Sequence, residues 1–330
     1  ARSLGPTRDA REPGATNRAS RRFTPREERF VELTTRAFVI PEAEQILGAT
    51  EPRERLAVCV DDGREPLGQR VCLSATVMSF GTDIELVGVG VQSDGDTVLV
   101  GHRVNSVTGF TEGVILEIEA DDGSVSESVL GTFGGNTFVT SISPNGQYVT
   151  GTSLYSDSSL PASGFLADVS NPGVLTATGG LGPIPESFGF DVSNSGTVVG
   201  TTDGLLVPYS WSTSSGIVGL TQPNGGARGI SNAEVIVGVD TTGINATTGL
   251  IVTTGFVFEN GSQSFLETPE GLSSFASDIS PNGEYIGGFL SFEDLTLFET
   301  INQAVVWVDG ALTQLNDAEG NAFEGKVFAV

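Results

Sequence analysis

Histidine, the side chain most often used as a catalytic base, occurs once in this sequence, as His102. A Ser/His/Asp or Cys/His arrangement would therefore have to be built around that one imidazole. His102 follows a glycine at a point where similar segments of the chain carry Thr152, Thr201, Val239 and Phe289. We interpret it as structural, because its position is an ordinary one in a repeated pattern. With no nucleophile elbow, zinc-protease motif or P-loop either, the sequence predicts no catalytic residue and a protein that is not an enzyme.

Carboxylates offer two further kinds of chemistry. Two of them could hydrolyse a glycosidic bond, but the chain has 41 acidic residues and no pair stands out. A carbohydrate-active enzyme is therefore only a third alternative. Calcium is the one ion that the sequence indicates, because oxygen ligands alternate around a glycine turn in a candidate site made of Asp317, Glu319, Asn321 and Glu324. Their spacing differs from that of an EF-hand, and a solvated acidic loop is the competing interpretation.

The two cysteines, Cys59 and Cys72, enclose a segment rich in turn-forming residues, and β-prone stretches flank it. Paired strands would bring the sulfurs together, so the sequence predicts a disulfide that closes a hairpin; two free buried thiols are the alternative. Disulfides form in oxidising compartments. Asn245 and Asn260 lie in Asn-x-Ser/Thr sequons and are candidate glycosylation sites. We expect a secreted, extracellular protein without a membrane span, its signal peptide already removed.

The elements that position these residues follow from an internal repeat. Five segments resemble one another, at residues 91–101, 142–151, 192–200, 230–238 and 279–288. Their turn positions are separated by 51, 50, 38 and 49 residues, which suits a blade of four short strands. Asn-Gly and Asp-Gly turns and alternating strands favour hairpins. In the fourth copy Glu234 replaces the turn glycine, so we expect that turn to differ. The sequence predicts an all-β fold, a single β-propeller.

A second hairpin follows in each repeat, and Trp211, Phe258 and Trp307 recur in it as inter-blade core residues. We expect the propeller in residues 41–330, with repeats at about 84–135, 136–185, 186–225, 226–272 and 273–320. An open ring would expose sheet edges. Residues 321–330 are therefore expected to join strands at 55–60 and 70–80 in a closing blade, stapled by Cys59–Cys72. This predicts about six blades, with five and seven as alternatives.

Three features carry a family resemblance: the Ile/Val-Ser-x-x-Gly-x-x-Val-x-Gly strand pair, the later aromatic-x-x-Gly hairpin, and the LGTFGG segment at 130–135. Over about residues 84–330 the pattern resembles the HAF extracellular repeat family of secreted bacterial and archaeal proteins. The resemblance implies a propeller-like extracellular protein. It implies no catalytic residue, because that family is defined by its repeats.

Charge divides the chain into a basic and an acidic part. Residues 1–26 have a net charge of +5, whereas residues 71–330 have a net charge of −26. The acidic part argues against nucleic acid as a partner. Residues 1–28 have few apolar residues and contain Gly-Pro and Pro-Gly steps, and residues 29–40 are more strand-like, which favours an extended basic arm over residues 1–40 with a strand-like end. We expect the arm to contact another subunit through Arg2, Arg8, Arg11, Arg18, Arg21, Arg22 and Arg26.

An arm that reaches from one copy to the next makes a head-to-tail contact, which produces rings or open polymers. The sequence therefore predicts an extracellular structural protein that self-assembles into a filament, tube or layer. In it, the basic arm of one subunit docks on the acidic propeller of the next. An arm folded back onto its own propeller is the competing interpretation. A monomeric secreted or cell-surface propeller that binds glycans or proteins is the alternative function.

Overall fold

The structure, a computed structural model, describes residues 55–60, 71–76, 83–182, 185–202, 207–220, 224–244, 249, 251–294, 299–317 and 320–330. The chain divides into two units, one of residues 1–43 and 56–75 and one of residues 44–55 and 76–330. Strands β1 (Arg55–Val60) and β2 (Val71–Thr76) form a two-stranded sheet of their own. Cys59 lies in β1 and Cys72 in β2, but their side chains lie outside the described part, so the disulfide stays a prediction. The expected arm, residues 1–40, also lies outside it.

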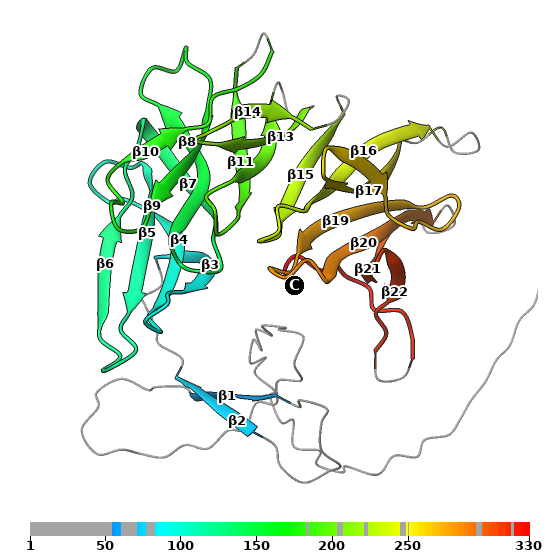
Figure 1. Cartoon of the computed structure of the whole chain (residues 1–330), viewed down its shortest axis with the longest axis horizontal. Helices are drawn as coiled ribbons and strands as arrows, with labels where there is room; N and C mark the ends of the chain where they lie inside the picture. Colours follow the sequence, from blue (N-terminus) through cyan, green and yellow to red (C-terminus); the bar gives the residue numbers. More distant parts are fainter. Residues whose placement is uncertain are drawn as a thin grey trace, which may run out of the picture. The chain divides into compact units, whose positions relative to one another are not determined.

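The second unit contains five four-stranded antiparallel sheets, each with its strands in sequence order (Figure 1). The first is β3 (Glu85–Val91), β4 (Thr97–Val104), β5 (Thr111–Ile118) and β6 (Val125–Val129), and the second is β7 (Gly134–Ile142), β8 (Tyr148–Tyr155), β9 (Ser163–Asp168) and β10 (Leu175–Ala177). The third is β11 (Ser187–Val192), β12 (Val198–Thr202), β13 (Val207–Ser212) and β14 (Gly216–Gly219), and the fourth is β15 (Gly225–Ile230), β16 (Ile236–Ile244), β17 (Ile251–Glu259) and β18 (Ser262–Phe265). The fifth is β19 (Ser273–Ile279), β20 (Tyr285–Asp294), β21 (Glu299–Val308) and β22 (Ala311–Gln314). No helix in the described part is long and apolar enough to cross a membrane.

The turn between the first two strands of each sheet keeps one geometry. In the second sheet the Gly146 amide donates to the Ser143 carbonyl over 2.8 Å, and Gly146 has a φ of 69°. Glycine adopts this left-handed conformation without a Cβ clash. The expectation that the fourth turn differs is wrong, because Glu234 takes a φ of 61° and donates its amide to the Ser231 carbonyl in the same way. Hydrogen bonds to its carboxylate, described below, help to hold this strained residue in place.

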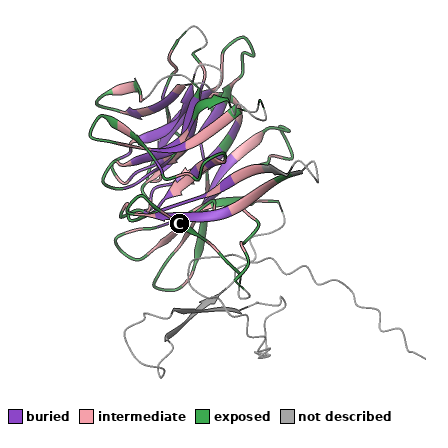
Figure 2. Cartoon of the chain, turned by 90° about the vertical axis from the view of Figure 1, so that its right-hand side faces the viewer, coloured by how far each residue is buried: buried purple, intermediate pink, exposed green. Residues whose placement is uncertain are grey.

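The apolar core lies between consecutive sheets rather than within one sheet. Four clusters of buried residues each join one pair of neighbours: first with second, second with third, third with fourth, and fourth with fifth. The buried stretches accordingly run along the strands inside the stack of sheets, and the loops are exposed (Figure 2). Trp307 is fully buried and Trp211 nearly so, which confirms that both are core residues. Sheets that pack face to face in sequence order are the architecture of a β-propeller.

The described sheets do not close a ring. Extensive contacts between the described strands join only consecutive sheets, and no extensive contact joins the first sheet to the fifth. Among the described four-stranded sheets, none precedes β3, and Val89 and Val91 on this strand are 58% and 52% exposed. Each later first strand, such as β11 or β15, buries its apolar residues against the preceding sheet. The structure thus confirms five four-stranded sheets, but it does not confirm six blades.

The strand expected at residues 321–330 is not formed, since Ala322 and Glu324 make only isolated bridges, yet residues 325–330 lie on the fifth sheet as a next first strand would. The Val330 amide donates to an Asp278 carboxylate oxygen over 3.0 Å, just as the Ile230 amide donates to Asp191 from one sheet to the next over 2.8 Å. Lys326 lies over the face of the Phe289 ring, and Phe289 holds the repeat position of His102, which Phe138 of the next sheet contacts edge to face. A strand is assigned by its ladder of hydrogen bonds, and among the described residues no second strand pairs with this segment.

Candidate functional site

A β-bulge occurs at the same place in the first strand of every sheet. The residues that have no partner across these bulges are Val87, Thr140, Phe190, Arg228 and Ser277. Bulges redirect a side chain and are frequent beside functional sites. The first strands of consecutive sheets contact one another, so the bulge residues form a row across the sheets. Phe190 and Arg228 are the two in this row whose side chains meet.

The third and fourth sheets enclose a hollow of about 430 Å³ at this meeting point. Its wall combines apolar side chains, two glycines and three polar side chains. The lining residues are Phe188, Phe190, Thr201, Asn224, Gly225, Gly226, Arg228 and Val239. The Arg228 guanidinium carbon lies 4.4 Å from the centre of the Phe190 ring. Cation–π attraction holds a guanidinium flat on an aromatic face. Within the part of the chain that the structure describes, the N–H groups at the edges of the guanidinium have no hydrogen-bond acceptor.

Arg228 has no carboxylate partner among the described residues. Only three described ion pairs exist, and they belong to His102 and Arg103. Partial withdrawal from water lowers the pKa of Arg228, and no neighbouring acid raises it. Arg103, by contrast, lies between Glu112 and Glu127, whose hydrogen bonds raise its pKa. In a chain with a net charge of −25, an arginine without an acid partner is unusual.

Two partly buried aspartates follow the bulges of the third and fifth sheets. Asp191 accepts hydrogen bonds from the Ser141 hydroxyl and from the Val192 and Ile230 amides, over 2.7, 2.8 and 2.8 Å. Burial, together with the charge of Asp278, raises the pKa of Asp191 to about 7. Burial also raises the pKa of Asp278. Gly229 holds the same repeat position in the sheet between them, where a Cβ would lie 3.0 Å from the Asp278 Cα atom. The Asp191 carboxylate joins consecutive sheets, Asp278 binds the Val330 amide, and neither lines this hollow or the one between the turns of the third and fourth sheets, so we assign them a structural role.

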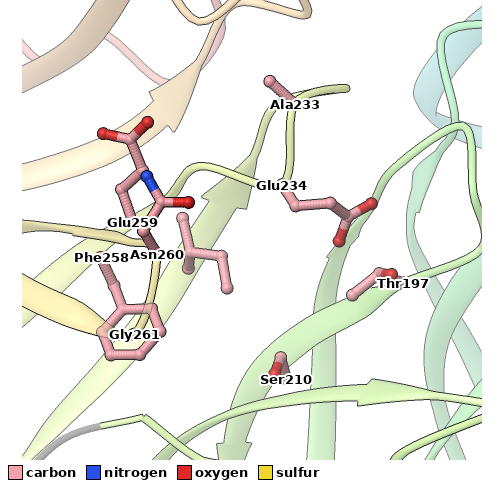
Figure 3. Close-up of a pocket in the computed structure, with 9 residues that line it drawn as sticks. Thr197, Ser210, Ala233, Glu234, Phe258, Glu259, Asn260 and Gly261 are labelled. Atoms are coloured by element: carbon pink, nitrogen blue, oxygen red, sulfur yellow. The ribbon is translucent and has the colours of Figure 1, made fainter.

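A second hollow, of about 310 Å³, lies between the turns of the third and fourth sheets. The Glu234 carboxylate points toward Thr197 and Ser210, and Glu259 and Asn260 lie on the opposite side (Figure 3). One Glu234 oxygen accepts hydrogen bonds from the Ser193 and Ser195 hydroxyls, over 2.8 and 2.5 Å. Carboxylate, amide and hydroxyl groups beside the Phe258 ring are the groups that sugars use as hydrogen-bonding and stacking partners.

His102 lies where the repeat predicts it. Its Nε2 atom is 3.5 Å from a Glu85 carboxylate oxygen, and its ring meets Phe138 edge to face with the centroids 5.8 Å apart. The Nδ1 atom is buried without a hydrogen-bond partner. Among the described residues, no hydroxyl or thiol is hydrogen-bonded to the imidazole to serve as a nucleophile. The structural interpretation of His102 stays the simpler one.

The expected calcium ligands are only partly described, because Glu319 lies outside the described residues. The Asn321 amide and side-chain nitrogen donate to the two Asp317 carboxylate oxygens over 2.8 and 3.1 Å. The Asn321 side chain thus presents a donor to Asp317, whereas a shared cation would need oxygens from both. The backbone of Glu324 forms an isolated antiparallel bridge with Gln303 of β21. The described residues contain no cluster of three potential metal-ligating side chains. Calcium binding stays a prediction without support from this geometry.

The sequons fall on different kinds of position. Asn245 lies outside the described residues, whereas Asn260 lies in the turn before β18, with a φ of 51°.

Sequence reasoning missed Arg228 and Asp191. A signal existed for both, since each is a charged residue within a first strand that is otherwise apolar or rich in glycine.

Comparison with known proteins gives a fold-level likeness only. No family model and no curated protein sequence matches the chain, so the HAF resemblance stays a prediction. Among solved structures, the β-propeller domain of the trilobed protease from Pyrococcus furiosus aligns at 11% identity and a TM-score of 0.44, over 72% of each chain. Pyrococcus horikoshii acylaminoacyl peptidase aligns at 12% identity and a TM-score of 0.40, over 70% of this chain and 39% of that one. The AtxE2 isopeptidase aligns at 10% identity and a TM-score of 0.28, over 72% of this chain and 56% of that one. The chain therefore spans less than two thirds of the last two proteins.

Proposed function

We propose that this protein is an extracellular structural protein that assembles into a filament, tube or layer. The basic residues 1–40 of one copy dock on the acidic sheets of the next. The observation that carries the proposal is the separation of charge along the chain. The described cationic side chains offer little neutralisation of the acidic surface, because Arg103 is already paired and because Arg228 and Lys326 lie on aromatic rings.

The end of the first sheet supplies a specific acidic surface. Asp96, Glu117, Glu119 and Asp122 crowd together there, and repulsion from Asp96 raises the pKa of the exposed Glu119. Unrelieved repulsion of this kind favours a cationic partner and weakens as salt screens the charges. A segment with a net charge of +5 in its first 26 residues has the matching chemistry.

Assembly of the 330-residue chain tests the proposal. The full chain should form large particles at low salt, as seen by light scattering and negative-stain electron microscopy, and should dissociate at high salt. Replacing Arg8, Arg11, Arg18, Arg21 and Arg22 by Gln should prevent assembly. The matched control replaces Arg53, Arg64 and Arg70, which lie outside the arm, and should still assemble. A full chain that is monomeric at every salt concentration would refute the proposal.

A closed ring of six sheets is the form that we propose for the subunit. Residues 325–330 supply the first strand of the sixth sheet, and β1 and β2 supply further strands, held by a Cys59–Cys72 disulfide. Two exposed apolar surfaces support this proposal: Val89 and Val91 on β3, and Phe328, which is 72% exposed. A sheet placed between them would cover both and remove the open edges.

Hydrogen exchange tests the closure. Deleting residues 325–330 should speed amide exchange in residues 55–60 and 71–76 as well as in β19 and β20. Faster exchange in β19 and β20 alone would show only that the segment covers the fifth sheet, and the closed ring would then be wrong. Phe328→Ser is a milder variant that should give the same pattern.

Glycan binding at the Glu234 hollow is the second candidate function, and the composition of its wall favours it. A Phe ring beside carboxylate, amide and hydroxyl groups suits a sugar with a polar edge and an apolar face. A monomer that binds a glycan on an array, and loses that binding in Glu259→Gln, would support this function over assembly. Glu270→Gln is the control, because Glu270 is exposed and does not line the hollow.

A further inference from the structure

We propose that the hollow between the third and fourth sheets binds a small organic carboxylate with an apolar body, through the Arg228 guanidinium. The inference is independent of both assembly and glycan binding. It starts from position: Arg228 and Phe190 are the bulge residues of adjacent sheets, and the bulges bring their side chains together. Because every first strand has this bulge, the arrangement depends on a recurring backbone feature rather than on a loop.

The charge of the hollow favours an anion. The guanidinium has five N–H donors, and none of them has an acceptor or an acid partner among the described residues. Contact with the Phe190 ring restricts the position of the guanidinium, and its planar fork can offer two parallel N–H groups to the two oxygens of a carboxylate. Arg228 is exposed, so water partly screens such a pair, and the bidentate geometry rather than burial must supply most of the affinity.

The wall of the hollow selects the rest of the ligand. Phe188, Phe190 and Val239 supply apolar surface, and Gly225 and Gly226 let a ligand approach the backbone closely. A volume of about 430 Å³ lies within the range of small-molecule sites. No described acid lines the hollow itself, although Asp240 pairs with Gly225 at its border, so Arg228 is the one charged side chain in the described wall.

Ligand-observed NMR with the full 330-residue chain tests the proposal, using 3-phenylpropionate and its neutral amide, 3-phenylpropionamide. The acid should bind at millimolar concentration and more tightly than the amide. Arg228→Gln should weaken binding of the acid about tenfold or more, the effect expected from losing a charge-assisted contact, and should leave the amide unchanged. Arg228→Lys should be intermediate, because it keeps the charge and loses the planar fork.

Lys326→Gln is the matched control, since it removes one positive charge from another aromatic ring outside the hollow. It should leave binding of the acid within about twofold, the limit expected if Lys326 acts only through screened long-range attraction. Near-ultraviolet circular dichroism of each variant reports whether the fold is kept. No binding of the acid, equal binding of acid and amide, or an acid affinity unchanged in Arg228→Gln would each overturn the proposal.

Discussion

Stability of this protein should fall as the pH rises from about 4 to 8, and Asp191 should account for part of that fall. The carboxyl has its pKa raised to about 7 in the folded protein, from an ordinary 3.8. Between these two values the folded state binds more protons than the unfolded state does. The free energy of unfolding therefore decreases as the pH rises through this range, and levels off above the folded pKa. A shift of about three units corresponds to at most about 4 kcal/mol.

Asp191→Asn isolates this contribution. All three groups that contact Asp191 donate hydrogen bonds, so an Asn amide leaves one backbone N–H without an acceptor. That costs about 1–3 kcal/mol at every pH. The variant has no charge to bury, however, and should lose the pH dependence that Asp191 causes. Relative to wild type, Asp191→Asn should be clearly destabilised at pH 5 and much less so, or not at all, at pH 8.5.

Urea unfolding followed by fluorescence of the buried Trp211 and Trp307 measures these free energies. Asp157→Asn is the control, because hydrogen bonds from Ser159 lower the pKa of Asp157 and its pH effect must have the opposite sign. Two parallel pH curves for wild type and Asp191→Asn would refute the reasoning. So would a variant whose relative stability worsens as the pH rises.

Three further predictions concern the core, the glycines within strands and the ion pairs. Trp307→Ala should cost about 3–5 kcal/mol in urea unfolding, because the side chain is fully buried and its indole N–H donates to the Glu267 carbonyl; a cost below about 1 kcal/mol would contradict the assignment to the core. Gly200→Ala should lower the free energy of unfolding by about 1–3 kcal/mol, because a Cβ there would overlap the Phe188 carbonyl oxygen. A Cβ at Gly243 would meet no atom, so the Gly243→Ala variant should have a melting temperature within about one or two degrees of wild type. Arg103→Gln should destabilise by about 1 kcal/mol at pH 7, where Glu112 and Glu127 would face each other without their shared cation. The pKa of Glu112 is lowered, so the stability lost in Arg103→Gln should shrink as the pH falls through that pKa and Glu112 becomes protonated. Equal losses of stability at pH 3 and pH 7 would argue against the ion pair.

The sequence was sufficient to predict the sheets, because their turns are local features. Ser-Pro-Asn-Gly at 143–146 and 280–283 defines a turn through the φ preferences of Pro and Gly, and the spacing of such turns reveals the repeat. Trp211 and Trp307 were also predictable as core, since each recurs at one place in the repeat.

The Arg228 hollow and the course of residues 325–330 were not predictable in this way. Phe190 and Arg228 meet because the bulges of two sheets align. A bulge is a change of backbone register, and no particular residue type at these positions predicts it. Residues 325–330 have the apolar pattern of a strand, but their course depends on contacts with Asp278 and Phe289 from another part of the chain. The left-handed turn at Glu234 was hidden because its compensating hydroxyls, Ser193 and Ser195, belong to the preceding sheet.

The four core clusters, each shared by just two neighbouring sheets, affect how the protein unfolds. In such a linear array, stability is approximately a sum of the intrinsic terms of the units and the coupling between neighbours. The third sheet has two neighbours, whereas the first, as described, has one. Opening fluctuations should therefore begin at the ends of the array and spread inward. Closing the ring would give every sheet two neighbours and would convert this graded fraying into a single cooperative transition.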